Sequence, residues 1–126
     1  MQTLICVGLG SFCGGIMRYG CGLWVQQHWG ESGFPRHTLL INLGGCLLLG
    51  VLNGLFSLRE LMHPDLRAAL TVGLCGGFTT FSTFSQESFR LMRSGAWVSA
   101  LSYVALSVFL GLILFGAGWW AARRVI

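Results

Sequence analysis

The sequence contains no lysine, only two prolines and only four carboxylate side chains, and charged residues make up 10% of its 126 residues. A soluble globular domain carries about 25% charged residues, so this composition excludes an ordinary soluble domain. The formal net charge of +4 comes entirely from arginine. In so apolar a chain we expect this charge to bear on orientation in a membrane, and we do not expect nucleic acid as a partner.

Motifs of catalysis and metal binding are also missing. The five cysteines form no CxxC pair, so they predict neither a disulfide framework nor a zinc site, and we interpret them as packing residues. The three histidines lie in or beside expected loops without metal-ligand spacing. The carboxylates form no pair and there is no nucleotide-binding loop, so we do not expect an enzyme.

Apolar length is what the chain has in abundance, since 54% of its residues are hydrophobic. Four windows are long enough to form helices of about 20 residues, which cross roughly 30 Å of hydrocarbon. They lie near residues 3–24, 38–58, 66–89 and 96–120. We therefore predict an all-α membrane protein in which residues 1–126 form a single four-helix transmembrane domain. The first window lacks the basic start and cleavage site of a signal peptide, so we expect it to span the membrane.

Arginines are distributed almost evenly over the two ends of this predicted bundle. If the N-terminus faces the cytoplasm, that side holds Arg59, Arg67, Arg123 and Arg124, and the opposite side holds Arg36, Arg90 and Arg93. The positive-inside rule then gives little preference for either orientation. Insertion in both orientations and a single orientation fixed by a weak bias both remain open.

Glycines at GxxxG spacing occur in the first two windows, as Gly10 with Gly14 and Gly50 with Gly54. Small residues at this spacing let membrane helices approach closely. Part of this packing can lie within one chain. Taken together, the glycines leave more small-residue surface than a four-helix monomer needs, so we expect an oligomer.

The stretch GLCGGFTTFSTFSQE, from Gly73 to Glu87, places five hydroxyl side chains within seven positions directly after a Gly-Gly pair. Glycine weakens a helix, and serine and threonine compete for its backbone hydrogen bonds. We therefore predict an interruption of the third helix near Gly76–Thr79, of a kind that membrane proteins tolerate where the freed backbone lines a cavity. Freed carbonyls there suit a small hard cation. A glycine kink that only packs a neighbour is the alternative.

Two different faces follow this interruption. Phe81 and Phe84 share one face at i, i+3, and Thr80, Thr83 and Glu87 share another at i, i+3, i+7. Because a phenyl ring has a positive edge, two rings presented edge-on can stabilise a small anion without holding it tightly. Phenylalanines that only fill core space are the alternative.

Further polar side chains lie inside the other windows. Asn42 offers two amide donors to an anion. Arg18 is an intramembrane charge and so a candidate for a functional site, or it extends to the interface from the end of its helix. Tyr103 and Ser107 add hydroxyl donors in the fourth window, although such residues commonly bond to neighbouring helices.

The run GLCGGFTTFSTFSQE, together with GGIMRYG and TLLINLGG, resembles the Fluc-type (CrcB-like) family of fluoride channels of microbial membranes. The resemblance covers the full length in the number and order of segments. It implies an antiparallel, dual-topology homodimer with two fluoride pores and a central structural sodium ion. The carbonyls of Gly76 and Thr79 from both subunits would bind this ion.

The resemblance also implies roles for the pore residues. Phe81 and Phe84 would line the pore by their ring edges, and Asn42 would face the same path. The family's polar pore-lining groups correspond to Thr38, Thr80, Thr83, Glu87, Tyr103 and Ser107, while Arg18 would draw anions into an aqueous vestibule. The implied activity is passive export of fluoride across the cytoplasmic (inner) membrane by a multi-pass protein.

Two other functional classes remain as alternatives. A small multidrug transporter would also be a four-helix, dual-topology dimer, but it needs a membrane-embedded carboxylate in its first helix, where this chain has Arg18 and no acid. An assembly or anchoring subunit without transport activity would leave the interrupted helix and its hydroxyl groups unexplained.

Overall fold

The computed structural model describes residues 1–58 and 62–125, and every regular element within them is helical. The long helices are α1 (Gln2–Trp29), α2 (Arg36–Leu58) and α6 (Trp97–Val125). Between α2 and α6 the chain forms α3 (Pro64–Ala68), the π-helix η1 (Ala69–Cys75), α4 (Gly76–Phe78) and α5 (Phe81–Arg93). The predicted all-α class is confirmed. Arg59, which entered the count of arginines at each end, lies outside the described residues.

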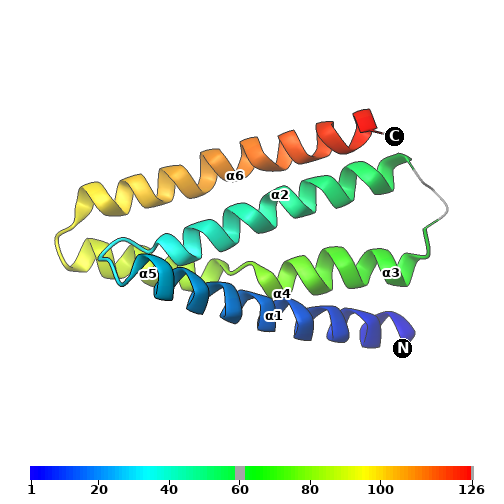
Figure 1. Ribbon diagram of the computed structural model, residues 1–126, viewed down its shortest axis with the longest axis horizontal. Coiled ribbons are helices and arrows are strands. Elements are labelled where there is room, and N and C mark those ends of the chain that lie inside the picture. The colour runs from blue at the N-terminus through cyan, green and yellow to red at the C-terminus, as the bar shows by residue number, and fades with distance from the viewer. Residues whose placement is uncertain (59–61, 126) are drawn as a thin grey trace.

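The helices run side by side along the long axis of the molecule. In Figure 1, α1 and the series α3 to α5 run in one direction, α2 and α6 run in the other, and both chain termini lie at the same end. Helix α2 packs along α6, and α1 packs along η1 and α4. The connection between α1 and α2 and that between α5 and α6 lie together at the opposite end.

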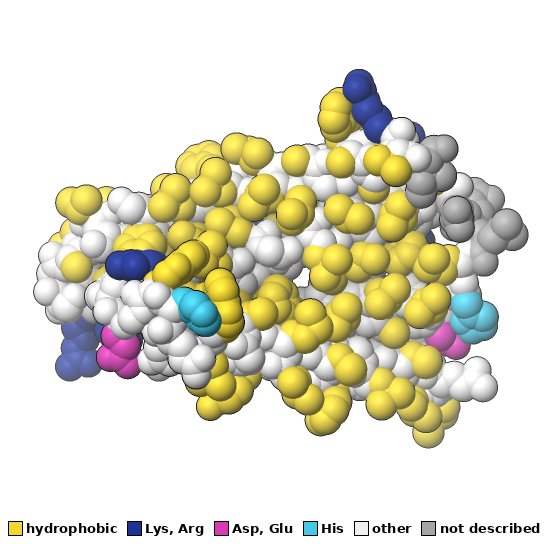
Figure 2. Space-filling model, in the orientation of Figure 1, with side chains coloured by type: hydrophobic (Ala, Val, Ile, Leu, Met, Phe, Trp, Pro, Cys, Tyr) yellow, Lys and Arg dark blue, Asp and Glu magenta, His cyan; other side chains and the backbone are white. Residues whose placement is uncertain are grey.

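Three of these helices, α1, α2 and α6, are long and apolar enough to cross a membrane. Figure 2 shows the surface that this implies, because apolar side chains cover the middle of the visible face and charged side chains gather toward its two ends. The third predicted window is divided among four elements, the longest of which is α5 with 13 residues. Since a single spanning helix needs about 20 residues, a fourth crossing stays a prediction.

The GxxxG glycines pack helices within one chain. A Cβ atom at Gly10 or Gly14 would collide with the carbonyl oxygen of Ala69 or Leu74 in η1. In the same way Gly50 lies against the backbone of Phe115 in α6. These close approaches account for the GxxxG spacing within one chain. The oligomer that we expected from the glycines taken together stays a prediction.

The predicted interruption of the third segment is present at the C-terminal edge of its expected position. Thr79 (φ −85°, ψ 157°) and Thr80 (φ −147°, ψ 113°) are extended, whereas Gly76 is helical (φ −65°, ψ −37°). Gly77 packs directly on the backbone of Ser11 in α1. The glycines therefore allow close packing, and the chain leaves the helix at the threonines.

Candidate functional site

Asn42 holds the interruption in place. Its side-chain Nδ2 donates to the carbonyl oxygen of Thr80 at 3.1 Å, and the Thr80 backbone N–H donates to its Oδ1 at 2.8 Å. The amide thus supplies one donor and one acceptor to the backbone of Thr80, which has left the helix. Asn42 uses its oxygen and one of its two amide hydrogens on Thr80, and donation of the second hydrogen to an anion stays a prediction.

The same pairing removes the helical partner of one backbone oxygen upstream. The Thr80 N–H is the group that would bond to the Gly76 carbonyl in a continuous α-helix, and it bonds to Asn42 instead. The Thr79 N–H and hydroxyl both donate to the Cys75 carbonyl, at 3.0 and 2.9 Å, while the Thr79 backbone turns extended. The carbonyls of Gly76 and Thr79 therefore lie at the break itself.

Thr80 also begins the next helix. Its Oγ1 accepts from the Thr83 N–H at 3.3 Å, which caps α5, and it donates to Thr83 Oγ1 at 3.0 Å. Because Thr83 Oγ1 accepts this bond, its own hydroxyl proton stays available to another acceptor. The hydroxyl residues that weaken a helix at the sequence level are thus the residues that end one helix and start another.

A buried carboxylate lies one turn beyond Thr83 in α5. Glu87 of α5 accepts from Thr38 Oγ1 of α2 at 2.9 Å and from Tyr103 OH of α6 at 2.8 Å. All three residues are buried, with Tyr103 at 0% exposure. The structure therefore brings these predicted pore residues together as one hydrogen-bonded group that joins three helices.

His37 adjoins this group, and sequence reasoning missed it. His37 lies in the first turn of α2, and its Nε2 is 3.4 Å from Oε1 of Glu87. From the sequence we place His37 in or beside a loop and give it no role. Its contact with Glu87 is not visible there, because the two residues are 50 positions apart and no local spacing connects them. Only the packing of α2 on α5 reveals the contact.

The two predicted pore phenylalanines stack on one another and continue toward Tyr103. The ring centroids of Phe81 and Phe84 are 5.7 Å apart, and those of Phe84 and Tyr103 are 5.2 Å apart. Phe84 is half-buried, whereas Phe81 is 79% exposed in the single chain. Phe81 therefore does not fill a core within the single chain.

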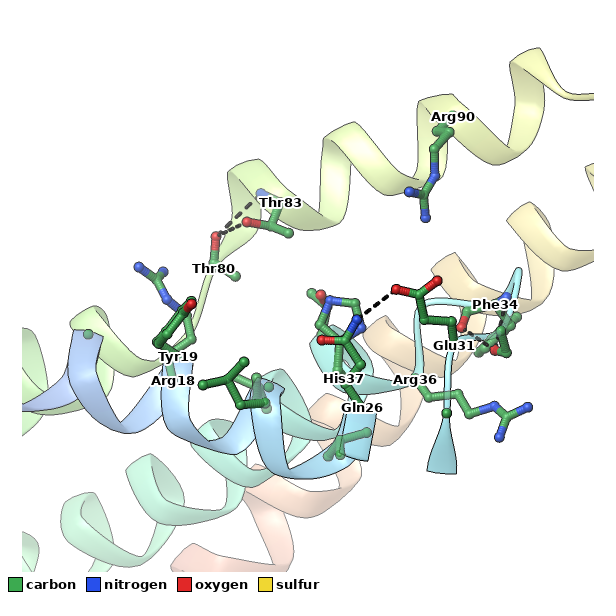
Figure 3. Close-up of a pocket in the computed structure, with 18 residues that line it drawn as sticks. Arg18, Tyr19, Gln26, Glu31, Phe34, Arg36, His37, Thr80, Thr83 and Arg90 are labelled. Atoms are coloured by element: carbon green, nitrogen blue, oxygen red, sulfur yellow. Dashed lines mark hydrogen bonds between the residues drawn. The ribbon is translucent and has the colours of Figure 1, made fainter. Parts of the chain in front are cut away.

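A cavity of about 550 Å³ opens between α1, the start of α2 and α5. Figure 3 shows its wall, where Thr80 and Thr83 lie at one side and Arg18, Arg90 and His37 point into or border the same space. Arg18 is half-buried and lines this cavity, as a vestibule residue would. Three arginines and Glu31 line it in all, so positive charge predominates; the third arginine is Arg36.

A second cavity of about 340 Å³ lies on the other side of the interruption. Its wall includes Asn42, Gly76, Thr79, Phe81, Phe84 and Ser107. The Ser107 hydroxyl donates to the Tyr103 carbonyl at 2.7 Å within α6, so one of its bonds stays inside the helix. Thr80 lines both cavities and is the residue that separates them.

The predicted residues therefore fall into three places. Arg18 and Thr83 border the first cavity, the phenylalanines and the break residues border the second, and Glu87 with Tyr103 lies buried beside both. Thr38 belongs to the buried group and also reaches the first cavity. Thr80 lines both cavities, of which the first has arginines in its wall and the second has phenyl rings.

Comparison with known proteins identifies the family of this chain. The family model described as CrcB-like protein, Camphor Resistance (CrcB), matches residues 5–119. The chain is 45% identical to the fluoride-specific ion channel FluC of Chloroflexus aurantiacus and 43% identical to that of Pseudomonas syringae, in each case over 94% of both proteins. It is 37% identical to the FluC of Sorangium cellulosum over 100% of this chain and 98% of the relative. The chain belongs to the CrcB-like family.

Proposed function

We propose that this protein is a fluoride-selective ion channel that lets fluoride leave the cell passively across the cytoplasmic (inner) membrane. The observation that carries the proposal is the succession of two cavities that meet at Thr80, with arginines around the first and phenyl rings along the second. The relatives named as fluoride-specific ion channels match along nearly the whole chain. No catalytic group is needed for this activity.

The fourth membrane crossing in this proposal is the discontinuous series α3 to α5. It extends beside α1 and α2 along the molecule and in the direction opposite to α2 (Figure 1). A broken helix is tolerated within a membrane where its free backbone groups are paired or line a cavity. The pairing of Thr80 with Asn42 and the cavity beside Gly76 and Thr79 meet this condition.

A second, antiparallel copy of the chain completes the site in this proposal. The second cavity opens on the surface of the single chain beside the exposed Phe81 ring, and its wall includes Gly76, whose carbonyl lacks the Thr80 N–H as a partner. An unpaired carbonyl in contact with hydrocarbon costs free energy, since lipid offers it no hydrogen bond. A partner copy would cover this face, and two copies would form two equivalent pathways.

A sodium ion bound by the Gly76 and Thr79 carbonyls is part of the same proposal. The residues fit this ion, because Na⁺ is a hard cation that prefers oxygen ligands, and Gly76 and Thr79 lie at the break and line the second cavity. Two copies would supply both carbonyls twice. The ion would hold the two broken helices together at the centre of the dimer. Exchange of sodium for N-methylglucamine during purification is expected to reduce flux and to destabilise the dimer.

Fluoride holds its hydration water strongly, so a selective path must replace that water without binding the ion firmly. The arginines at the first cavity raise the local concentration of anions. Where the two cavities meet, the free hydroxyl proton of Thr83 can donate to the ion, and beyond this point the ring edges of Phe81 and Phe84 offer weak positive charge. A series of weak partners lets the ion enter and leave.

The test is anion efflux from liposomes that contain the purified protein, followed with a fluoride electrode and compared with chloride. We expect fluoride efflux that exceeds chloride efflux by several orders of magnitude. Equal rates for the two anions would refute selectivity. Efflux of neither would favour an anchoring subunit, and proton-driven transport of an organic cation would favour a multidrug transporter, although α1 has no carboxylate for that chemistry.

A further inference from the structure

We propose that His37 is a further pathway residue, whose protonated imidazole offsets the charge of Glu87 and makes fluoride flux fall as pH rises. The inference rests on the proposed channel function. It concerns how the same site is regulated, and it assigns to His37 a role that does not follow from the family resemblance.

The geometry places His37 between water and the buried acid. Its Nε2 lies 3.4 Å from Glu87 Oε1, and its side chain is 48% exposed where it lines the first cavity, whereas the Glu87 side chain is 9% exposed. Figure 3 shows the imidazole at the wall of this cavity, between the helix that contains Arg18 and the connection that contains Glu31. A proton from the cavity can therefore reach the imidazole directly.

Glu87 needs a cation beside it for anions to pass. Each of its oxygens accepts one hydroxyl proton, from Thr38 and from Tyr103, and this donor set suits an ionised carboxylate. Tyr103 in turn contacts the Phe84 ring, so the negative charge lies next to the proposed aromatic wall. An uncompensated carboxylate there repels fluoride, and a charged imidazole in contact with it removes most of that repulsion.

The other charged groups around the pair belong to α1, α2, α5 and the α1–α2 connection. Arg18 on α1, Arg36 on α2 and Arg90 on α5 line the same cavity, and arginine keeps its charge over the whole physiological pH range. Glu31 in the α1–α2 connection is bonded to Gln26 at 2.9 Å and stays at the outer part of the cavity. Histidine is the side chain whose charge ordinarily changes between about pH 5 and 8, so His37 is the group that would produce a pH response there.

The sign of the response follows from this arrangement. At low pH the imidazole is protonated, the pair is neutral as a whole, and the field where the two cavities meet comes from the arginines. At high pH the imidazole is neutral, the net charge of the pair is −1, and anion entry becomes less favourable. Flux through the wild-type protein should therefore decrease by roughly three- to tenfold between pH 5.5 and pH 8.

The experiment measures fluoride efflux from liposomes at equal internal and external pH, in steps from pH 5.5 to 8.5. It compares the wild type with His37→Gln and His37→Lys, and protein-free liposomes at each pH give the leak of neutral acid to subtract. We expect His37→Gln to show a low flux that does not depend on pH and His37→Lys to show a high flux that does not depend on pH. Rescue by the permanent cation would identify charge, and not shape, as the property that matters.

Parallel pH profiles for the wild type and His37→Gln would overturn the inference, as would a low flux with His37→Lys in protein that elutes like the wild type. Glu87→Gln gives an independent check, because it removes the negative charge that the imidazole offsets and should raise the flux at pH 8 toward the wild-type flux at pH 5.5. If the wild type transports no fluoride at any pH, the proposed function fails, whereas a wild-type flux that is strong and flat refutes only the role of His37.

Discussion

At the residue scale, the side chains near the break use most of their hydrogen bonds within the chain, and few of their groups stay available to an ion. Asn42 bonds to both backbone groups of Thr80, and Thr80 caps α5 through Thr83. The groups that remain after these bonds are available to an ion, and they include the second amide hydrogen of Asn42, the Thr83 hydroxyl proton and the phenyl edges. A substitution that frees Thr80 therefore acts first on structure.

Asn42→Ala is expected to lower both stability and flux. It leaves the N–H and C=O of Thr80 without partners, and each unpaired buried group costs about 1–3 kcal/mol. The matched control is Asn53→Ala on the same helix, because the Asn53 amide bonds to the Leu49 carbonyl within α2. Thermal unfolding in detergent and fluoride efflux from liposomes are the measurements. Equal losses in both variants would show that Asn42 does not hold the break.

Phe81→Ile and Phe84→Ile are each expected to slow fluoride efflux by at least about tenfold, because isoleucine keeps the apolar volume but removes the positive ring edge. Phe89→Ile is the matched control, since Phe89 is also on α5 and 65% exposed but borders neither cavity. Efflux rates and the elution volume of each purified variant are compared. Wild-type rates in both pore variants would rule out the aromatic mechanism.

Prediction from sequence was most successful for the local pattern at this scale. The faces of Phe81 with Phe84 and of Thr80 with Thr83 follow from helical spacing, and the structure preserves both. The contact of His37 with Glu87 could not be predicted, because it depends on how α2 packs on α5. The bond of Asn42 to Thr80 could not be predicted for the same reason, since the two residues are 38 positions apart.

At the element scale, the third segment combines two short α-helices and a π-helix before the break. The π-helix Ala69–Cys75 packs against α1, where glycines remove the side chains that would keep the backbones apart. From the sequence we interpret Gly76 and Gly77 as residues that weaken the helix, yet both are helical in the structure. In a membrane no water competes for backbone hydrogen bonds, so glycine there weakens a helix less and serves close packing more. The π-helix has no local sequence signal because it results from this packing.

Gly14→Ala is expected to destabilise the protein, because a Cβ at this position collides with the Leu74 carbonyl and comes within 2.8 Å of the Phe78 nitrogen. Overpacking of this kind typically costs about 1–3 kcal/mol. Gly20→Ala on the same helix is the matched control, since no neighbouring atom lies within 4 Å of its added Cβ. Alanine favours a helix over glycine, so the control should be neutral or slightly more stable. Thermal unfolding of both variants decides, and equal stability would contradict the packing of α1 on η1.

At the scale of the whole molecule, the fold places similar charge at both ends. Arg67, Arg123 and Arg124 lie toward the end with the termini, and Arg36, Arg90 and Arg93 lie toward the other (Figure 1). The all-α class and the order of the helices could be predicted from apolar windows alone. The proposed partner copy and its direction stay predictions, because the balance of charge in a single chain does not determine the outcome of insertion.

Insertion in both orientations gives the last prediction. Ser32→Cys, in the exposed α1–α2 connection, introduces a thiol at one end of the molecule, and Cys13 and Cys21 are replaced by alanine because both are exposed on α1. A membrane-impermeant maleimide should label about half of the copies in intact cells and the remainder after permeabilisation, as expected for a protein without orientation bias. Arginine added to one end should shift this fraction toward one extreme. Complete labelling, or none, in intact cells would establish a single orientation and exclude the antiparallel dimer.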